Sequence, residues 1–318
     1  MTEWFDFLRL FGGFVYLVLG GDLLVRGALG LSRRTSISPV LIGLTVVAFG
    51  TSAPELVISV LATAQGVTGV ALGNVVGSNI ANIVLVLGLP ALIHPLVSRS
   101  RELTMQTVFM VLVSIAFVAL AADGSLSRID GSVLVVVLTA MLAVAYRRRL
   151  AVPGVDSPDE DEQFERVLGL PNRVPVAMLF LVLGIVLLPL GADLTVAGAV
   201  GIARSFDIPD ILIGSTIVAL GTSLPELSTT IIAAFHRSAD IALGNVIGSN
   251  VFNILLVAGT SALVAPLPVP EHFRDFDLWL MLAIAVVFLL FIAARWPIGR
   301  IAGLVCTGVY AGYCLRLV

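Results

Sequence analysis

The chain has 318 residues, a net charge of −3, 58% hydrophobic residues and only 12% charged residues. A soluble globular domain carries about 25% charged residues, so this composition excludes an ordinary soluble protein and indicates one whose solvent is the lipid bilayer. The small net charge gives no reason to expect a nucleic-acid partner, and no feature of the sequence indicates an obligate protein partner.

A helix that crosses a bilayer needs about 20 apolar residues. By that rule we predict an all-α, polytopic membrane protein with ten transmembrane helices. The predicted spans are residues 9–31, 39–64, 70–96, 103–122, 130–147, 174–202, 210–235, 241–265, 276–294 and 297–315. Cys306 and Cys314 both fall in the last span, where we expect two small side chains that pack in a helix and no disulfide framework.

One polar interruption, residues 148–173, divides the spans into two groups of five. We therefore predict a first five-helix repeat over residues 1–147, a cytoplasmic linker over residues 148–173 and a second five-helix repeat over residues 174–318. The linker is rich in Asp and Glu, but their spacing does not match a known calcium-binding loop.

The two groups of spans are copies of each other. Residues 20–96 align without a gap onto residues 191–267, with about half of the positions identical and a constant offset of 171. Because each group has an odd number of spans, the second copy enters the membrane from the opposite side. The sequence therefore predicts an inverted repeat with a pseudo-two-fold axis in the membrane plane.

The arginines predict an orientation. All 18 basic residues are arginines, and 13 of them fall on one side of the membrane when the spans alternate from the N-terminus. Since cytoplasmic loops carry the excess of positive charge, we expect both termini outside and the linker inside. We expect an integral protein of a prokaryotic inner membrane.

Two polar segments in each copy interrupt the apolar runs. The first reads Gly-Thr-Ser-Ala-Pro-Glu and ends at Glu55; its copy, Gly-Thr-Ser-Leu-Pro-Glu, ends at Glu226. The second contains Gly-Asn followed by Gly-Ser-Asn and ends at Asn82 or Asn253. A carboxylate at bilayer depth is costly and is seldom present without a function. Matched glutamates with no arginine beside them in the membrane therefore indicate a cation or proton site.

These residue types suit a hard cation. Ca²⁺ binds six to eight oxygens from carboxylates, amides, hydroxyls and carbonyls. Such oxygens are present at Thr51, Ser52, Glu55, Ser78 and Asn82, and at Thr222, Ser223, Glu226, Ser249 and Asn253. Pro54 and Pro225 lack an amide proton, so each frees a carbonyl upstream, and the glycines at positions 50 and 221 allow the helix to open there. We expect broken helices at the membrane centre.

A structural role competes with a functional role for several of these residues. Single Ser and Thr residues in membrane helices commonly bond back to their own backbone. We expect Asn74, Asn79, Asn245 and Asn250 at close helix crossings rather than at the site. Asp22 and Asp193 could lie on the ion path, although interhelical contact is the simpler interpretation. The three histidines, His94, His236 and His272, fall at span ends or in loops, and we do not expect them to cluster or to be ligands.

The paired motifs around Glu55 and Ser78, repeated around Glu226 and Ser249, resemble the two alpha-repeats of the sodium/calcium exchanger family in the cation/calcium antiporter superfamily. The resemblance covers both copies. It implies extrusion of Ca²⁺ driven by Na⁺ through alternating access at one central site, with the ions as cargo and no cofactor and no enzymatic activity. It also implies that the first and sixth spans slide against the core, and their glycines, among them Gly20, Gly27, Gly191 and Gly198, would permit close contact there.

The resemblance also implies a set of ligands. The Ca²⁺ ligands would be Glu55, Glu226 and oxygens of Thr51 and Thr222. The flanking Na⁺ sites would use the Ala48 carbonyl, Ser52 and Ser78 and, in the second copy, the Ala219 carbonyl, Ser223 and Ser249. Asn82 and Asn253 would complete the centre.

Some members of the family carry Asp at the position of Asn253, and the potassium-dependent relatives carry Asp at the positions of both Asn82 and Asn253. With two carboxylates at the centre, one Ca²⁺ or two Na⁺ neutralise the site, so we expect K⁺-independent exchange that is electrogenic if three Na⁺ bind. The alternative is a H⁺/Ca²⁺ antiporter, or one for another divalent cation, in which the same glutamates bind protons. A passive cation channel and an intramembrane hydrolase fit the repeat less well.

Overall fold

The computed structural model describes residues 2–35, 37–97, 100–151, 169–171, 173–208, 217 and 219–317. Most of the predicted linker and the first part of the predicted span 210–235 lie outside these residues, so both stay predictions. The described elements are α1 (Thr2–Arg34), α2 (Pro39–Ile42), η1 (Gly43–Val47), α3 (Ala48–Thr51), α4 (Ala53–Ala64), α5 (Thr68–Val84), α6 (Gly88–Ile93), α7 (Arg101–Ala121), β1 (Ser125–Leu126), α8 (Arg128–Ala151), α10 (Val174–Ser205), α12 (Ala219–Thr222), α13 (Leu224–Phe235), α14 (Ala239–Phe252), η3 (Asn253–Ala258), α15 (Gly259–Val264), β2 (Leu267–Pro268), η4 (Phe273–Asp277), α16 (Leu278–Ala293) and α17 (Arg300–Leu317).

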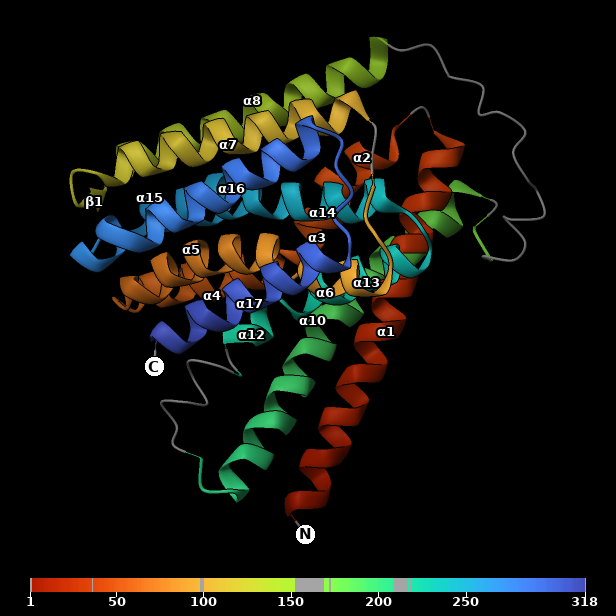
Figure 1. Cartoon of the computed structure of the whole chain (residues 1–318), viewed down its shortest axis with the longest axis horizontal. Coiled ribbons are helices and arrows are strands. Elements are labelled where there is room, and N and C mark those ends of the chain that lie inside the picture. Colours follow the sequence, from red (N-terminus) through yellow and green to blue (C-terminus); the bar gives the residue numbers. More distant parts are fainter. Residues whose placement is uncertain are drawn as a thin grey trace.

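The chain is mostly helical, and several of its helices could cross a bilayer (Figure 1). Within the described residues, seven helices are long and apolar enough to do so, or eight if the bent pair formed by residues 39–51 and 53–64 is one span. The predicted tenth span corresponds to α17, which has 18 residues but is less apolar and falls outside this set. The prediction of ten spans is therefore met in part.

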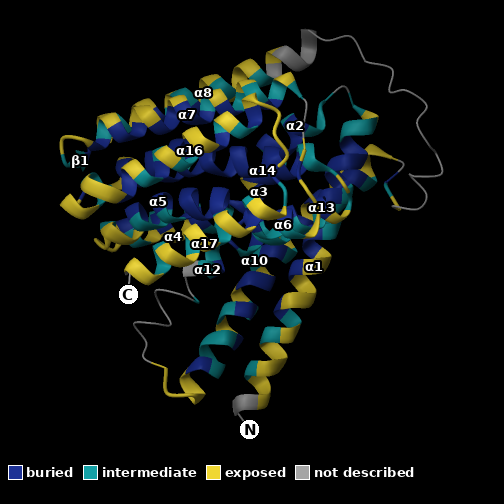
Figure 2. Cartoon of the chain, viewed as in Figure 1, coloured by how far each residue is buried: buried dark blue, intermediate teal, exposed yellow. Residues whose placement is uncertain are grey.

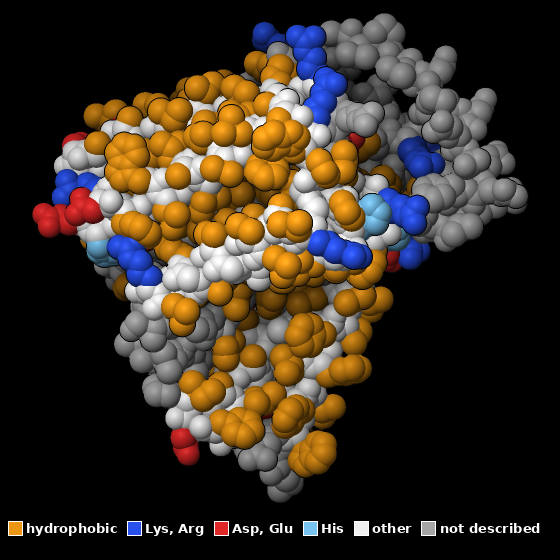
Figure 3. Space-filling model, viewed as in Figure 1, with side chains coloured by type: hydrophobic (Ala, Val, Ile, Leu, Met, Phe, Trp, Pro, Cys, Tyr) orange, Lys and Arg blue, Asp and Glu red, His pale blue; other side chains and the backbone are white. Residues whose placement is uncertain are grey.

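The helices are arranged in layers of different burial (Figure 2). The share of buried residues in the 18-residue apolar stretch of each span differs between the spans. This share is 94% in residues 239–264, which contain α14, 78% in residues 68–93, which contain α5, and 17% in residues 128–145 of α8. The helices that carry the second polar segment of each copy therefore form the centre. On the visible face of the molecule, apolar side chains cover the middle and charged side chains gather at its ends (Figure 3), as expected for a protein surrounded by lipid.

Local sequence signals explain where the helices begin. Ser38 accepts a hydrogen bond from the backbone amide of Leu41 at 3.1 Å and so caps α2, with Pro39 at the first turn. Ser100 caps α7 in the same way through the amide of Leu103. A two-stranded antiparallel pair of β1 and β2 joins the ends of two helices, with Leu126 opposite Leu267.

Two long helices, α1 and α10, pack against each other in antiparallel directions and extend beyond the rest of the bundle (Figure 1). A Cβ added at Gly13 would lie 2.8 Å from the carbonyl oxygen of Gly191, and one at Gly184 would lie 2.8 Å from that of Gly20. The offset of 171 exchanges these two pairs, because Gly13 corresponds to Gly184 and Gly20 to Gly191. The contact is therefore symmetric about a two-fold axis between the two helices.

The glycines of α1 and α10 do not have the role expected for them. Gly27 and Gly198 also face the partner helix, where an added Cβ would lie 2.8 Å from the amide nitrogen of Leu181 and 2.5 Å from the carbonyl of Asp6. These glycines therefore bring α1 and α10 together, and the sliding of the two helices on the core stays a prediction. Gly21 is different, because it lies against Ser228 of α13.

Candidate ion site

The first polar segment of each copy breaks a helix at the same place. In the first copy α3 ends at Thr51, Ser52 has φ −86° and ψ 3°, and α4 begins at Ala53. In the second copy α12 ends at Thr222 and Ser223 has φ −87° and ψ 3°. The two helices of the first copy meet at an angle of 44°. The prolines, which cannot donate a backbone hydrogen bond, lie in the first turns after the breaks.

The breaks place the two glutamates at the starts of α4 and α13. Glu55 and Glu226 lie in the first turns of these helices and are 1% and 0% exposed. The N-terminal end of a helix carries partial positive charge, which favours a carboxylate there. The two carboxyl groups also lie within electrostatic reach of each other. Both copies thus contribute an acidic group to one buried region.

Hydroxyl and amide groups connect the two copies around these glutamates. Ser52 donates a hydrogen bond to Oε1 of Glu226 at 3.2 Å. The hydroxyl of Thr51 lies 3.3 Å from Oδ1 of Asn245 and 3.4 Å from the hydroxyl of Ser249. Residues almost 200 positions apart therefore form one polar cluster, which includes members of both predicted motifs.

Asn82 belongs to the same polar core. Its Nδ2 atom donates a hydrogen bond to Oδ1 of Asn250 at 3.1 Å, again across the two copies. This contact uses the amide nitrogen of Asn82 and leaves its carbonyl oxygen without a partner. Asn250 therefore fixes the orientation in which Asn82 presents its oxygen.

Asn74 and Asn245 were expected at helix crossings and not at the site. Each holds the helix that follows a break: Asn74 donates to the hydroxyl of Ser59 at 2.9 Å, and Asn245 donates to that of Thr230 at 3.3 Å. Asn245 also contacts Thr51 of the candidate site. The signal that could have identified these pairs is their spacing, because both asparagines lie 15 residues after their partners in matched positions of the repeat.

Unpaired buried atoms concentrate on the predicted residues. In the described part of the chain, seven buried side-chain nitrogen or oxygen atoms have no hydrogen-bond partner. Five of them belong to Glu55, Glu226, Asn82 and Asn253, and the other two belong to Ser261 and Arg274. Since more than nine-tenths of buried polar groups are normally paired, the four oxygens among these five atoms suit a site that receives a cation; the fifth atom, Nδ2 of Asn253, is a donor.

The helices widen just after the two central asparagines. Asn253 begins the π-helix η3, and the matched segment after Asn82 leaves the α-helix, with the amide of Val86 bonded to the carbonyl of Ala81 five residues earlier. π-Type turns inside helices frequently occur at functional sites. The widening leaves room for side-chain oxygens at the centre of the bundle.

The remaining predicted residues lie around the same region. Ala48 is fully buried, and its carbonyl oxygen lies 3.3 Å from the hydroxyl of Thr51. Ser78 bonds to Asn74 at 3.4 Å, and Ser223 lies at the second helix break and is 2% exposed. Ala219 begins α12, and Thr222 at its end is partly buried.

The two aspartates outside the motifs differ from each other. Asp22 forms an ion pair with Arg26 at 2.8 Å, and Nε2 of His236 lies 2.9 Å from its other oxygen. His236, at the end of α13, therefore joins that helix to α1, a contact that the sequence did not indicate. Asp193, the matched residue of the second copy, is exposed.

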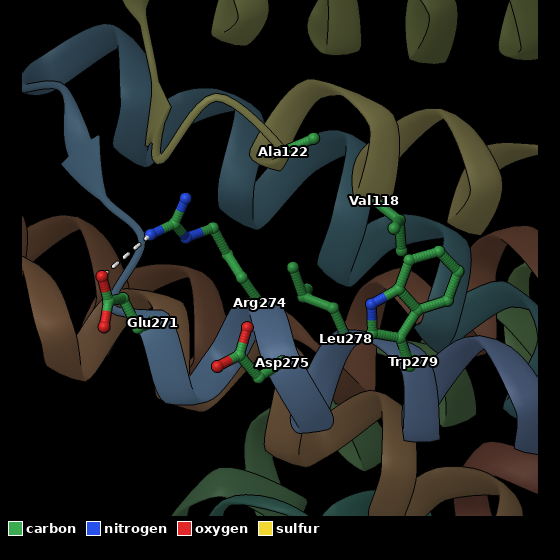
Figure 4. A pocket seen from close by; sticks show the side chains of 7 residues that line it. All are labelled: Val118, Ala122, Glu271, Arg274, Asp275, Leu278 and Trp279. Carbon is green, nitrogen blue, oxygen red and sulfur yellow. Dashed lines mark ion pairs between the residues drawn. The ribbon is translucent and has the colours of Figure 1, made fainter.

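A polar cavity of about 420 Å³ lies away from these residues. The cavity is open and lies between the end of α7 and η4. Arg274 extends over it, with its guanidinium 3.9 Å from a carboxylate oxygen of Glu271, and Trp279 lies on the other side (Figure 4). It contains none of the predicted ligands. In the described residues no group of three or more His, Cys, Asp or Glu side chains is placed to hold a metal. The candidate site thus has two carboxylates and otherwise neutral oxygens.

Comparison with known proteins assigns the chain to a family. The family model for "Sodium/calcium exchanger protein" matches residues 5–147 and 176–318, which include both copies of the motifs. The chain belongs to the sodium/calcium exchanger family.

Relatives and a solved structure agree with this assignment. The chain is 38% identical to the "Putative antiporter CaxA" of Alkalimonas amylolytica, over 95% of each protein. It is 34% identical to the "Sodium/calcium exchanger MaX1" of Methanosarcina acetivorans, over 98% of each. The structure of the sodium-calcium exchanger NCX_Mj soaked with zero Na⁺ and Ca²⁺ is similar with a TM-score of 0.85 and 32% identity, over 99% of each chain.

A more distant relative is the "Ca(2+)/H(+) antiporter ChaA" of Bacillus subtilis, which is 27% identical over 68% of this chain and 65% of that protein. As a member of the exchanger family, the chain is an integral membrane antiporter and not an enzyme. Its fold is that of NCX_Mj.

Proposed function

We propose that this exchanger moves Ca²⁺ in one direction and Na⁺ in the other by alternating access at the buried site of Glu55 and Glu226. The observation that carries this proposal is the set of unpaired buried atoms on Glu55, Glu226, Asn82 and Asn253. Two carboxylates and two amide oxygens supply hard ligands from both copies, as Ca²⁺ and Na⁺ require.

We extend the proposal to the ligand sets that the resemblance to the exchanger family implies. Ca²⁺ takes both carboxylates together with oxygens of Thr51 and Thr222. The Na⁺ sites use Ser52, Ser78 and the carbonyl of Ala48 and, in the second copy, Ser223, Ser249 and the carbonyl of Ala219. Support comes from the hydrogen bonds that join Thr51 and Ser52 to the opposite copy and from burial, which covers this set apart from Ala219 and Thr222.

The architecture that we infer is an inverted repeat of ten helices, with repeats over residues 1–147 and 174–318 around a cytoplasmic linker over 148–173 and both termini outside. Support comes from matched helix breaks at Ser52 and Ser223 and from the symmetric antiparallel contact of α1 with α10. Corresponding helices that run in opposite directions are what an inverted repeat requires.

Shared ligands couple the two fluxes. Because Glu55 and Glu226 bind either cargo, Ca²⁺ and Na⁺ cannot fill the site together. An empty site would carry two bare carboxylates across the low-dielectric interior, and this penalises the unloaded transition. With no Asp at positions 82 and 253, one Ca²⁺ neutralises the site, so exchange needs no K⁺ and carries net charge if three Na⁺ bind.

Transport in liposomes tests the proposal. Purified protein is reconstituted and loaded with Na⁺, and uptake of radioactive Ca²⁺ is measured with and without a Na⁺ gradient, with and without K⁺, and at imposed membrane potentials. Glu55→Gln and Glu226→Gln should abolish Na⁺-dependent uptake. Glu271→Gln, at a carboxylate that is 87% exposed, is the matched control and should leave uptake unchanged. Exchange retained in both site variants would refute the proposed site.

A H⁺/Ca²⁺ exchange is the second candidate, because a Ca²⁺/H⁺ antiporter is among the relatives. In that case the same glutamates would carry protons on the return step. Ca²⁺ uptake driven by a pH gradient in Na⁺-free liposomes would favour it. Uptake that follows the Na⁺ gradient alone would favour Na⁺ as the driving ion.

A further inference from the structure

An apolar groove of about 320 Å³ is lined by residues of α5, α16 and α17 and of the segments next to them. Its lining has no polar surface and includes Val84 and Leu87 after the polar segment, Val287 of α16, and Val305 and Cys306 of α17. Val287 is 53% exposed and Val305 is 61% exposed, so the groove opens toward the bilayer.

The first copy has an equivalent helix at this place. The outer helices α8 and α17 correspond with an offset of 172. Leu126, before α8, pairs with Leu267, and the equivalent Ile298, before α17, pairs with Leu96. A Cβ added at Gly131 would lie 2.6 Å from the carbonyl oxygen of Gly259, and one at the equivalent Gly303 would lie 2.6 Å from that of Gly88.

With this offset, Cys306 stands where the first copy has Leu134. A Cβ built at Gly259 lies 3.2 Å from Cβ of Leu134, and one built at Gly88 lies 3.2 Å from Cβ of Cys306, so the two side chains occupy equivalent places. Leu134 is 2% exposed. The cysteine side chain is smaller than the leucine side chain, so it fills less of this place than Leu134 does in the other copy.

Basic and aromatic residues lie at one end of the groove. Ile298 and Ala302 line that end, and exposed Arg300 lies between them, at the start of α17. Phe291, which also lines the groove, packs edge-to-face against Trp296, which is 59% exposed and follows exposed Arg295. Tryptophan and arginine at the end of an apolar span are typical of the membrane interface, and basic groups there attract anionic headgroups.

We propose that this groove binds one acyl chain of an anionic phospholipid, with the phosphate of that lipid at Arg295 and Arg300. The site is also placed to act on transport. Its wall begins at Ile83, directly after Asn82 of the candidate ion site, where the helix leaves its α-helical path. A bound chain therefore supports the widened turn from its lipid side.

Native mass spectrometry of the full purified chain tests the proposal. The protein is incubated in detergent with phosphatidylglycerol or phosphatidylcholine of identical acyl chains, and retained lipid is counted. Wild type should retain one phosphatidylglycerol in preference to phosphatidylcholine. Cys306→Leu, which restores the leucine of the first copy, should lose the retained lipid, whereas Cys306→Ala and Cys314→Leu should keep it.

The headgroup is tested separately. Arg295→Gln combined with Arg300→Gln should lower the preference for phosphatidylglycerol by roughly tenfold, the scale of a charge-assisted hydrogen bond. Arg128→Gln, at the matched arginine of α8, should not change it. Arg128 and Arg300 each donate a hydrogen bond to a carbonyl near the end of a helix, at 3.2 Å. Replacing either arginine therefore removes an equivalent bond within the protein, and only the loss of Arg300 should affect the lipid.

The outcomes that overturn the proposal are specific. Wild type without retained lipid, equal retention by Cys306→Leu, or no preference between the two lipids would each refute it. If wild type is a dimer and Cys306→Leu makes it a monomer, the groove is a contact between two copies of the chain and not a lipid site. Ala283→Leu fills the groove from α16 and gives the same test if Cys306→Leu does not fold; the size-exclusion profile reports folding for both.

Discussion

The crossing of α14 with the first broken helix predicts an unequal response to one substitution at matched positions. A Cβ added at Gly248 would clash with the carbonyl oxygen of Leu44 and lie 2.5 Å from Cβ of Ala48. A Cβ added at Gly77, the matched residue of the first copy, meets no described atom within 4 Å. Gly248→Ala should therefore force α14 away from α3, and Gly77→Ala should be accommodated in this conformation.

The magnitude follows from the comparison of the two variants. Replacing a glycine inside a helix by alanine gains about 1 kcal/mol of helix propensity, and this gain is common to both. Overpacking costs about 1–3 kcal/mol and applies to Gly248→Ala alone. The difference in stability between the variants should therefore be about 1–3 kcal/mol.

Thermal unfolding of both purified variants in the same detergent measures this difference. Gly248→Ala should have a lower apparent melting temperature than wild type, and Gly77→Ala should be equal to or above wild type. Equal melting temperatures for the two variants, or a larger loss for Gly77→Ala, would show that the packing around α14 has been misread.

Two further predictions concern the ion site and its surroundings. Asn253→Asp adds a third carboxylate to the buried centre, so the apparent melting temperature should fall when no cation is present. Added CaCl₂ should then raise the melting temperature of this variant by more than it raises that of wild type. An equal rise for the two proteins would place Asn253 outside the site. His236→Ala removes the 2.9 Å contact with Asp22 and should cost about 1 kcal/mol, whereas Gln65→Ala, at the exposed matched position, should cost nothing measurable by thermal unfolding. If the two substitutions lower the stability equally, the contact between His236 and Asp22 does not stabilise the protein.

Local chemistry made part of the site predictable. The proline and glycine around Thr51 and Glu55 predict a helix break there, and the structure has it at Ser52 and again at Ser223. The constant offset of 171 predicts which residues are equivalent. Both signals depend only on neighbouring residues or on the repeat, so one sequence is enough to find them.

The contacts between the two copies could not be predicted in the same way. The pairing of Thr51 with Asn245 and of Asn82 with Asn250 depends on how helices of different copies cross, which hydropathy does not encode. The contact of His236 with Asp22 likewise joins the end of one helix to the middle of another. The role of the glycines in α1 was missed because their spacing shows a close contact but not which helix makes it.

The glycine contacts between α1 and α10 have a mechanical consequence. Two helices whose backbones approach closely at Gly13, Gly20, Gly184 and Gly191 should move as one rigid unit, because separating them would open a gap along their contact. If the proposed alternating access uses a tilt of this unit, one end would approach the bundle as the other end leaves it. The two faces of the membrane would then never be open to the site together, which would prevent a leak of ions.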